Sequence, residues 1–162
     1  MTSLLLFAPV AQADVLPEYR LKAAFLYNFA TFTQWPPTVG RTLNVCVHGP
    51  NPFGSALGAL HGKAVGTRRI VVPRPGGGQP LKECQVLFIS APAIGDLPRL
   101  LKQLGNTPVL TVAESPGAAS AGVALNMAVA QNRITFEANP AAARAAQLVL
   151  SSKLLRLATQ VH

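Results

Sequence analysis

Acidic residues are scarce in this sequence. Asp and Glu together number 6 among 162 residues, against 14 Lys and Arg, which gives a net charge of +8. The carboxylates stand apart along the chain, whereas general acid–base catalysis uses a placed pair. No G-x-S-x-G nucleophile motif accompanies His48 or His61. The sequence therefore predicts no catalytic residues and a protein that is not an enzyme.

Motifs for metals, nucleotides and nucleic acids are also missing. Cys46 and His48 are close in the chain, but no C-x-x-C or H-x-x-x-H spacing completes a metal site. The segment GALHGKA, residues 58–64, is one residue short of the spacing of a phosphate-binding loop. Basic residues are scattered and are not interleaved with aromatic ones, as they are in nucleic-acid-binding surfaces. We expect no metal, no cofactor and no nucleic acid partner.

Long hydrophobic runs are absent, since no stretch reaches the roughly 18–20 apolar residues of a membrane span. The start, MTSLLLFAPVAQA, has a short apolar segment from Leu4 to Val10 followed by Ala11-Gln12-Ala13, an A-x-A cleavage site. We interpret residues 1–13 as a partial export signal without its positive region, and residues 14–162 as a single extracytoplasmic domain. An ordinary buried N-terminal strand is the alternative.

The sequence has only two cysteines, Cys46 and Cys84, and each lies on or beside a predicted strand. In an oxidising compartment two cysteines in one small domain favour a disulfide. Two separate buried thiols are the alternative reading of the same residues.

Alternating strand and helix patterns predict an α/β layered single domain, with a mixed, mostly parallel sheet, a C-terminal β-hairpin and flanking helices. A turn near Gln131-Asn132 joins the two hairpin strands, and Asn139-Pro140 is a good start for the helix that follows. The predicted strands are 42–47, 68–72, 86–90, 108–112 and the hairpin from 123 to 136. The predicted helices are 17–35, 53–60, 94–104, one after Pro140 and one in SSKLLRLATQ.

The first predicted helix is crowded with aromatic residues. At 100° per residue its core stripe contains Leu21, Ala24, Phe25, Asn28, Phe29, Phe32 and Trp35. Asn28 is therefore predicted to be a buried structural polar residue. The opposite face is also apolar, and we predict it as a possible partner or dimer surface; it contains Tyr19, Ala23, Leu26, Tyr27 and Ala30. Packing of this face against the leucines of the C-terminal helix is the alternative.

Four segments in order resemble the YfiR-like family. They are EYRLKAAFLYNFATFTQWP (18–36), CQVLFIS (84–90), TVAESPGAASAGVALNM (111–127) and NRITFEANPAAARAAQLVLSSKLLRLA (132–158). The resemblance covers essentially the whole chain after the signal. It implies a periplasmic α/β protein and also a structural disulfide between Cys46 and Cys84. The sequence departs from the family at Gln147, where such sequences often have Gly, and it lacks a second cysteine pair.

The resemblance further implies a regulatory binding protein. It predicts repression, through protein–protein contact, of an inner-membrane diguanylate cyclase or related membrane sensor, and thereby control of cyclic di-GMP signalling. It also implies a homodimer and an outer-membrane lipoprotein as a further partner. The alternative function is a periplasmic small-ligand-binding sensor, with a ligand held in a cleft beside the sheet.

Overall fold

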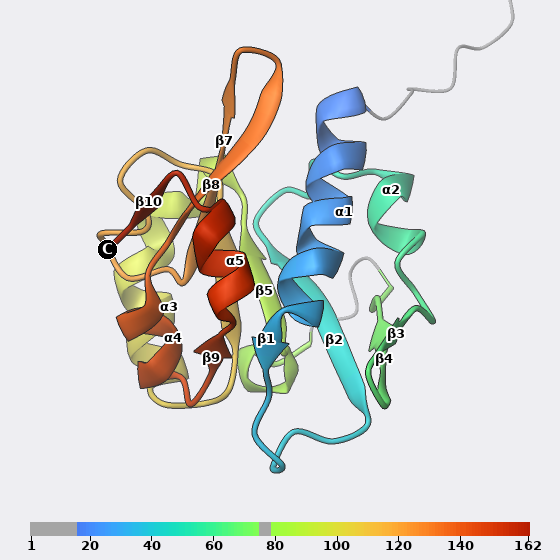
Figure 1. Ribbon diagram of the computed structural model, residues 1–162. Helices are drawn as coiled ribbons and strands as arrows, with labels where there is room; N and C mark the ends of the chain where they lie inside the picture. Colours follow the sequence, from blue (N-terminus) through green and yellow to red (C-terminus); the bar gives the residue numbers. More distant parts are fainter. Residues whose placement is uncertain (1–15, 75–78) are drawn as a thin grey trace, which may run out of the picture.

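The computed structural model of the chain describes residues 16–74 and 79–162 (Figure 1), so the expected export signal at 1–13 lies outside the described residues. The helices are α1 (Pro17–Thr31), α2 (Ser55–Gly58), α3 (Leu97–Leu104), α4 (Pro140–Ala145) and α5 (Ser152–Leu157), with 3-10 turns η1 (Leu81–Glu83) and η2 (Ala91–Asp96). The strands are β1 (Thr33–Gln34), β2 (Thr42–His48), β3 (Ala64–Val65), β4 (Arg68–Val71), β5 (Val86–Ile89), β6 (Leu110–Ala113), β7 (Leu125–Ala130), β8 (Arg133–Ala138), β9 (Val149–Leu150) and β10 (Gln160–Val161).

The main sheet has eight strands in the order β10-β8-β7-β6-β5-β2-β4-β3, and β1 pairs with β9 in a separate two-stranded sheet. The inner run β4-β2-β5-β6-β7 is parallel, whereas β8 is antiparallel to β7 and β3 is antiparallel to β4. The chain starts this parallel run at β2, goes to β4 on one side, and then returns to β5 on the other. This is the reversal of strand order that defines a doubly wound α/β sheet.

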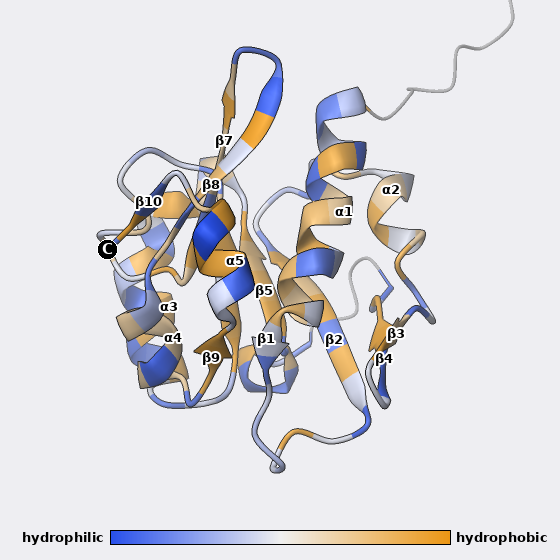
Figure 2. Cartoon of the chain, in the orientation of Figure 1, coloured by the Kyte–Doolittle hydropathy of each residue, from blue (hydrophilic) through white to orange (hydrophobic). Residues whose placement is uncertain are grey.

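Helices cover both faces of the sheet and enclose two apolar clusters. On one face α1, α2, α4 and α5 contribute to the larger cluster, around Phe29, Phe53 and Phe88. On the other face α3 places Leu97, Leu100 and Leu104 against Leu87 and Ile89 of β5. Figure 2 shows the hydrophobic residues running along β2 and β5 in the middle of the molecule. The predicted α/β layered fold is therefore confirmed.

Local sequence signals position the C-terminal third of the chain. Gln131 and Asn132 both have positive φ, 51° and 60°, which is the backbone of the two-residue turn that fits a twisted hairpin. Asn139 caps α4, because its side-chain oxygen accepts a hydrogen bond from the backbone N–H of Ala142 at 3.0 Å. Gln147 also has a positive φ, 62°, the conformation that favours glycine.

The predicted core stripe of α1 was wrong in its rotation. Asn28 is exposed, and Leu21 is 51% exposed, so Asn28 is not a buried structural polar residue. The buried residues of α1 are instead Lys22, Ala23, Leu26, Phe29 and Ala30. The core face of α1 therefore includes Ala23, Leu26 and Ala30 of the apolar face that was predicted to lie opposite the core, together with Lys22, whose ammonium is buried because it pairs with the carboxylates of Glu18 and Glu114.

Three of the five residues of the predicted partner surface lie in the hydrophobic core. Ala23, Leu26 and Ala30 are each at most 3% exposed within the single chain, so they are unavailable to a partner. They pack in the larger cluster against the sheet and α2, and α5 adds Leu154 to the same cluster. Internal packing, the alternative reading of this face, is the correct one for these residues.

The rotation of α1 yields a stability prediction with a matched pair of substitutions. Leu26→Ala removes a fully buried side chain and should lower the free energy of unfolding by about 2–5 kcal/mol. Asn28→Ala changes an exposed helical position and should alter it by less than about 0.5 kcal/mol. Urea unfolding of both variants checks this. A large loss for Asn28→Ala would mean that the helix has the rotation expected from the sequence.

Candidate functional site

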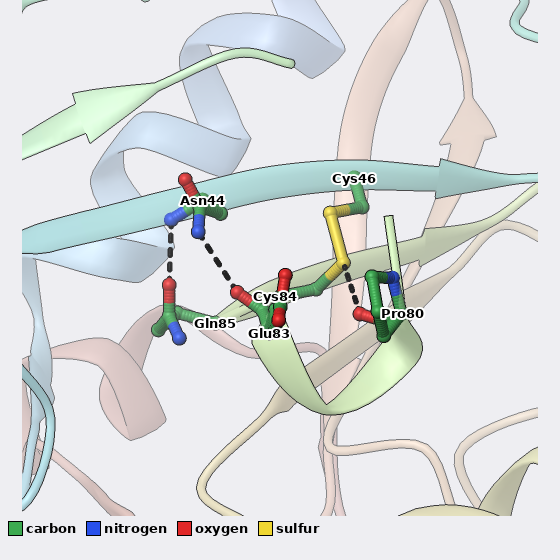
Figure 3. The surroundings of a disulfide bond; sticks show 6 residues. All are labelled: Asn44, Cys46, Pro80, Glu83, Cys84 and Gln85. Carbon is green, nitrogen blue, oxygen red and sulfur yellow. Dashed lines mark hydrogen bonds between the residues drawn. A yellow bond between two sulfur atoms is a disulfide. The ribbon is translucent and has the colours of Figure 1, made fainter. Parts of the chain in front are cut away.

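The two cysteines form a disulfide between β2 and the short segment that precedes β5. Cys46 and Cys84 are bridged with their Cα atoms 5.9 Å apart (Figure 3). Beside the bridge, the backbone N–H of Asn44 donates to Oε1 of Gln85 at 2.7 Å, and its side-chain amide donates to the carbonyl of Glu83 at 2.9 Å. Sγ of Cys84 lies 3.8 Å from the carbonyl oxygen of Pro80. The bridge and these hydrogen bonds fasten the end of the β4–β5 connection to β2.

A buried ion cluster joins α1 to the carboxyl end of β6. Nζ of Lys22 lies 2.7 Å from Glu18 and 2.7 Å from Glu114, and the side chains of Lys22 and Glu114 are only 5% and 6% exposed. The hydroxyl of Tyr19 donates a further hydrogen bond to Glu114 at 3.1 Å. Two carboxylates and a phenol therefore surround one ammonium, as a buried charge requires.

This cluster shifts the pKa values of its two proton donors upward. Burial acts to lower the pKa of Lys22, but hydrogen bonds to Glu114 and Glu18 outweigh it, and the pKa of this ammonium is raised. The pKa of Tyr19 is raised by burial, together with the negative charge of Glu114 and the hydrogen bond to it. Both groups are thus held in their protonated forms. The contact of Lys22 with Glu114 has no signal in the sequence, because the two residues are 92 positions apart in the chain.

The two tyrosines of the predicted surface are half-buried, and both are engaged within the chain. The ring of Tyr19 packs edge-on against Phe53 at 5.6 Å between centroids. The hydroxyl of Tyr27 donates to the carbonyl of Ala64 at 2.6 Å, and the ammonium of Lys63 lies 5.1 Å from the centre of its ring. These contacts orient both rings, and part of each remains open to solvent.

His48, Asp96 and Ser90 meet at the carboxyl ends of β2 and β5. Nε2 of His48 lies 2.8 Å from Oδ2 of Asp96, and this hydrogen bond, with the positive charge of Arg99, lowers the pKa of Asp96. The hydroxyl of Ser90 is buried and donates to the backbone carbonyl of His48 at 3.1 Å, not to the imidazole. The three residues therefore lack the serine–histidine contact of a hydrolase, and they fasten the turn after β5 to β2.

Within residues 16–74 and 79–162, no group of three or more His, Cys, Asp and Glu side chains gathers as a metal site would require. In the same ranges no helix is both long and apolar enough to cross a membrane.

One comparison with known proteins identifies the chain. The model of a family described as YfiR/HmsC-like matches residues 19–159, which is most of the sequence and includes α1 from Tyr19 onward, the disulfide and the C-terminal hairpin.

Removing the disulfide should destabilise the protein strongly. The bridge closes a loop with a sequence separation of 38 residues, for which the chain-entropy relation gives roughly 4 kcal/mol of stabilisation. We expect the double variant Cys46→Ala, Cys84→Ala to lose about that much free energy of unfolding in urea. Two thiols that react with an alkylating agent in the folded, unreduced protein would contradict the bridge.

The ion cluster gives a double-mutant prediction. Lys22→Met leaves the Glu114 carboxylate buried without its cation and should cost about 3–5 kcal/mol. Combining Lys22→Met with Glu114→Met replaces the pair by apolar groups and should recover much of that loss. Lys102→Met, at an exposed position of α3, is the matched control and should change little. Strictly additive losses in the double variant would show that the two residues do not interact.

Alkaline pH should weaken the same cluster. A pKa that is raised on folding stabilises the protein below the unfolded value, and this contribution disappears as the pH rises through the folded value. For Tyr19 and Lys22 the unfolded values are about 10, so the loss should begin only above that pH. We expect wild type to lose stability above about pH 10 more steeply than the variant Tyr19→Phe, Lys22→Met. Equal slopes would speak against the raised pKa values.

Proposed function

The chain belongs to the YfiR/HmsC-like family, and from that membership we propose that it is a periplasmic repressor of an inner-membrane diguanylate cyclase or a related membrane sensor. Repression would occur through protein–protein contact and would lower cyclic di-GMP synthesis. At family level the match supports a periplasmic regulator of cyclic di-GMP signalling, and this is the observation on which the proposal rests.

The chemistry of the chain agrees with this location and role. A disulfide persists in an oxidising compartment such as the periplasm. The polar side chains at the carboxyl edge of the sheet hold the turn after β5 and the helix α1 rather than offering a poised nucleophile. A regulator that acts by contact needs an outer surface, and α1 and the β7–β8 hairpin offer one.

The proposed contact surface is an apolar strip between α1 and the hairpin. Phe25 of α1 packs against Phe136 of β8 at 6.3 Å between ring centroids, so these two elements lie side by side. Leu21, one turn before Phe25, is 51% exposed, and Val129, which pairs with Ile134 in the hairpin, is 50% exposed. Figure 1 shows both elements extending toward the same end of the molecule. This strip replaces the buried residues Ala23, Leu26 and Ala30 as the candidate surface for the membrane partner.

The test combines a pull-down with a measurement of cyclic di-GMP in cells. We expect the tagged protein to recover a membrane diguanylate cyclase or sensor from solubilised membranes, and deletion of its gene to raise cyclic di-GMP. Leu21→Gln combined with Val129→Thr should abolish recovery and repression while the urea midpoint stays near wild type. Val149→Thr, at a valine of β9 with nearly the same exposure of 48%, is the matched control.

Three results would count against the proposal. They are an unchanged cyclic di-GMP level in the deletion strain, recovery of no membrane enzyme, or equal effects of the strip variant and the Val149→Thr control.

The homodimer and the outer-membrane lipoprotein stay predictions. Sedimentation of the purified protein tests the homodimer, and the same pull-down tests the lipoprotein. A small-ligand sensor remains a second candidate, because the structure contains a cavity of suitable size beside β2.

A further inference from the structure

The strand β2 changes its neighbour halfway along its length. Its residues Thr42 to Asn44 pair with β4, and its residues Val45 to His48 pair with β5. On the β4 side, therefore, no described strand accompanies β2 beyond Asn44. The connection from β4 to β5 contains only the short turn η1 in its described part, where a doubly wound fold commonly has a helix.

The open edge of β2 presents backbone hydrogen-bonding groups. The backbone N–H of Gln85 donates to the carbonyl of Asn44, and that of Ser90 donates to the carbonyl of His48, so these residues turn their backbone groups toward β5. Because successive residues of a strand alternate in direction, the N–H and C=O of Val47 point to the opposite side. No β4 residue pairs with Val47 there.

A cavity of about 520 Å³ occupies this place. Its volume lies within the roughly 300–1,000 Å³ of small-molecule sites. Its walls are the second half of β2 and residues of α2. The described residues that follow β4, 72–74, and several that precede β5, between 79 and 84, complete the lining. The Cys46–Cys84 disulfide forms part of the wall and holds these segments together. β2 is also the strand at which the order of the sheet reverses, and ligands of doubly wound sheets bind beyond the carboxyl ends of strands at such a point.

The lining combines an apolar body with positive and hydrogen-bonding groups. Val72, Leu57 and Leu87 supply apolar surface, whereas Arg74, Asn51 and Ser55 supply polar side chains. None of the lining residues is Asp or Glu. His48 at the wall already has Asp96 as its partner, while Arg74 forms no ion pair within the described ranges. Among the described lining residues, the charge without an ionic partner is thus the exposed guanidinium of Arg74, a group that binds carboxylates and phosphates through paired hydrogen bonds.

We propose that this cavity is a binding site for a small organic anion with an apolar body, such as an aryl or alkyl carboxylate. The anionic group lies at Arg74 and the N–H of Val47, and the apolar body lies against Val72 and Leu87. This inference does not depend on repression of a cyclase, because its test measures binding to the purified protein alone.

The test uses three probes with the same body and different charge: 3-phenylpropanoate, 3-phenylpropan-1-ol and 3-phenylpropylamine. Binding to the full exported chain is followed by calorimetry and by amide chemical shifts in NMR spectra. We expect phenylpropanoate to bind tightest and the amine weakest, with the largest shifts at Val47, His48 and Val72. Arg74→Gln should weaken phenylpropanoate binding by roughly tenfold, the loss of one charge-assisted hydrogen bond, and leave the alcohol unchanged.

A second variant fills the cavity without touching its charged group. Gly58 lines the cavity from α2, and a Cβ added there meets nothing within 4 Å, so Gly58→Leu should fold and block all three probes. The matched controls are Gly40→Leu, another glycine with open space around it, and Arg133→Gln at an exposed position of β8; both should bind as wild type does. The proposal is overturned if no probe binds at millimolar concentration, if the amine binds as well as the carboxylate, or if Gly58→Leu binds normally.

Discussion

The arrangement of this molecule depends on one buried charge. Lys22 lies on the core face of α1, where its ammonium meets Glu114 at the carboxyl end of β6 and Glu18 one turn earlier in the helix. A buried ammonium is tolerated only with its carboxylates in place, so the pair fixes both the rotation of α1 and its position along the sheet. Leu26, Phe29 and Ala30 then face the core, and Leu21 faces solvent.

The same interaction explains which features of the fold could be predicted from the sequence and which could not. Local signals predicted most elements well: the apolar run of β5, the turn at Gln131-Asn132 and the cap at Asn139 each depend on residues close in the chain. The choice between the two apolar faces of α1 could not be made from the sequence, because Lys22 is expected to face solvent until Glu114, 92 positions away, is placed beside it. The short strands β1, β3, β9 and β10, of two residues each, were also missed, since tertiary contacts rather than propensity create them.

The candidate functional sites also include some features that the sequence predicted and others that only the fold reveals. The disulfide was expected from compartment, count and family resemblance, whereas the pairing of His48 with Asp96 and the change of neighbour along β2 appear only when the strands are assembled. The consequence is a molecule with two separate regions of interest. We propose the apolar strip along α1 and the hairpin as the surface for a protein partner, and the cavity beside β2 as the site for a small anion.

Direct observation of the Lys22 side chain is the sharpest test of whether this buried charge fixes α1. Nitrogen-detected NMR of lysine ammonium groups, with Lys22 assigned through the Lys22→Met variant, gives its pKa in the folded protein. We expect a pKa above the ordinary lysine value of about 10.4, together with slow exchange of the ammonium protons, because Glu114 and Glu18 accept hydrogen bonds from them. A pKa below the ordinary value would mean that burial dominates and that the ion pair does not fix α1.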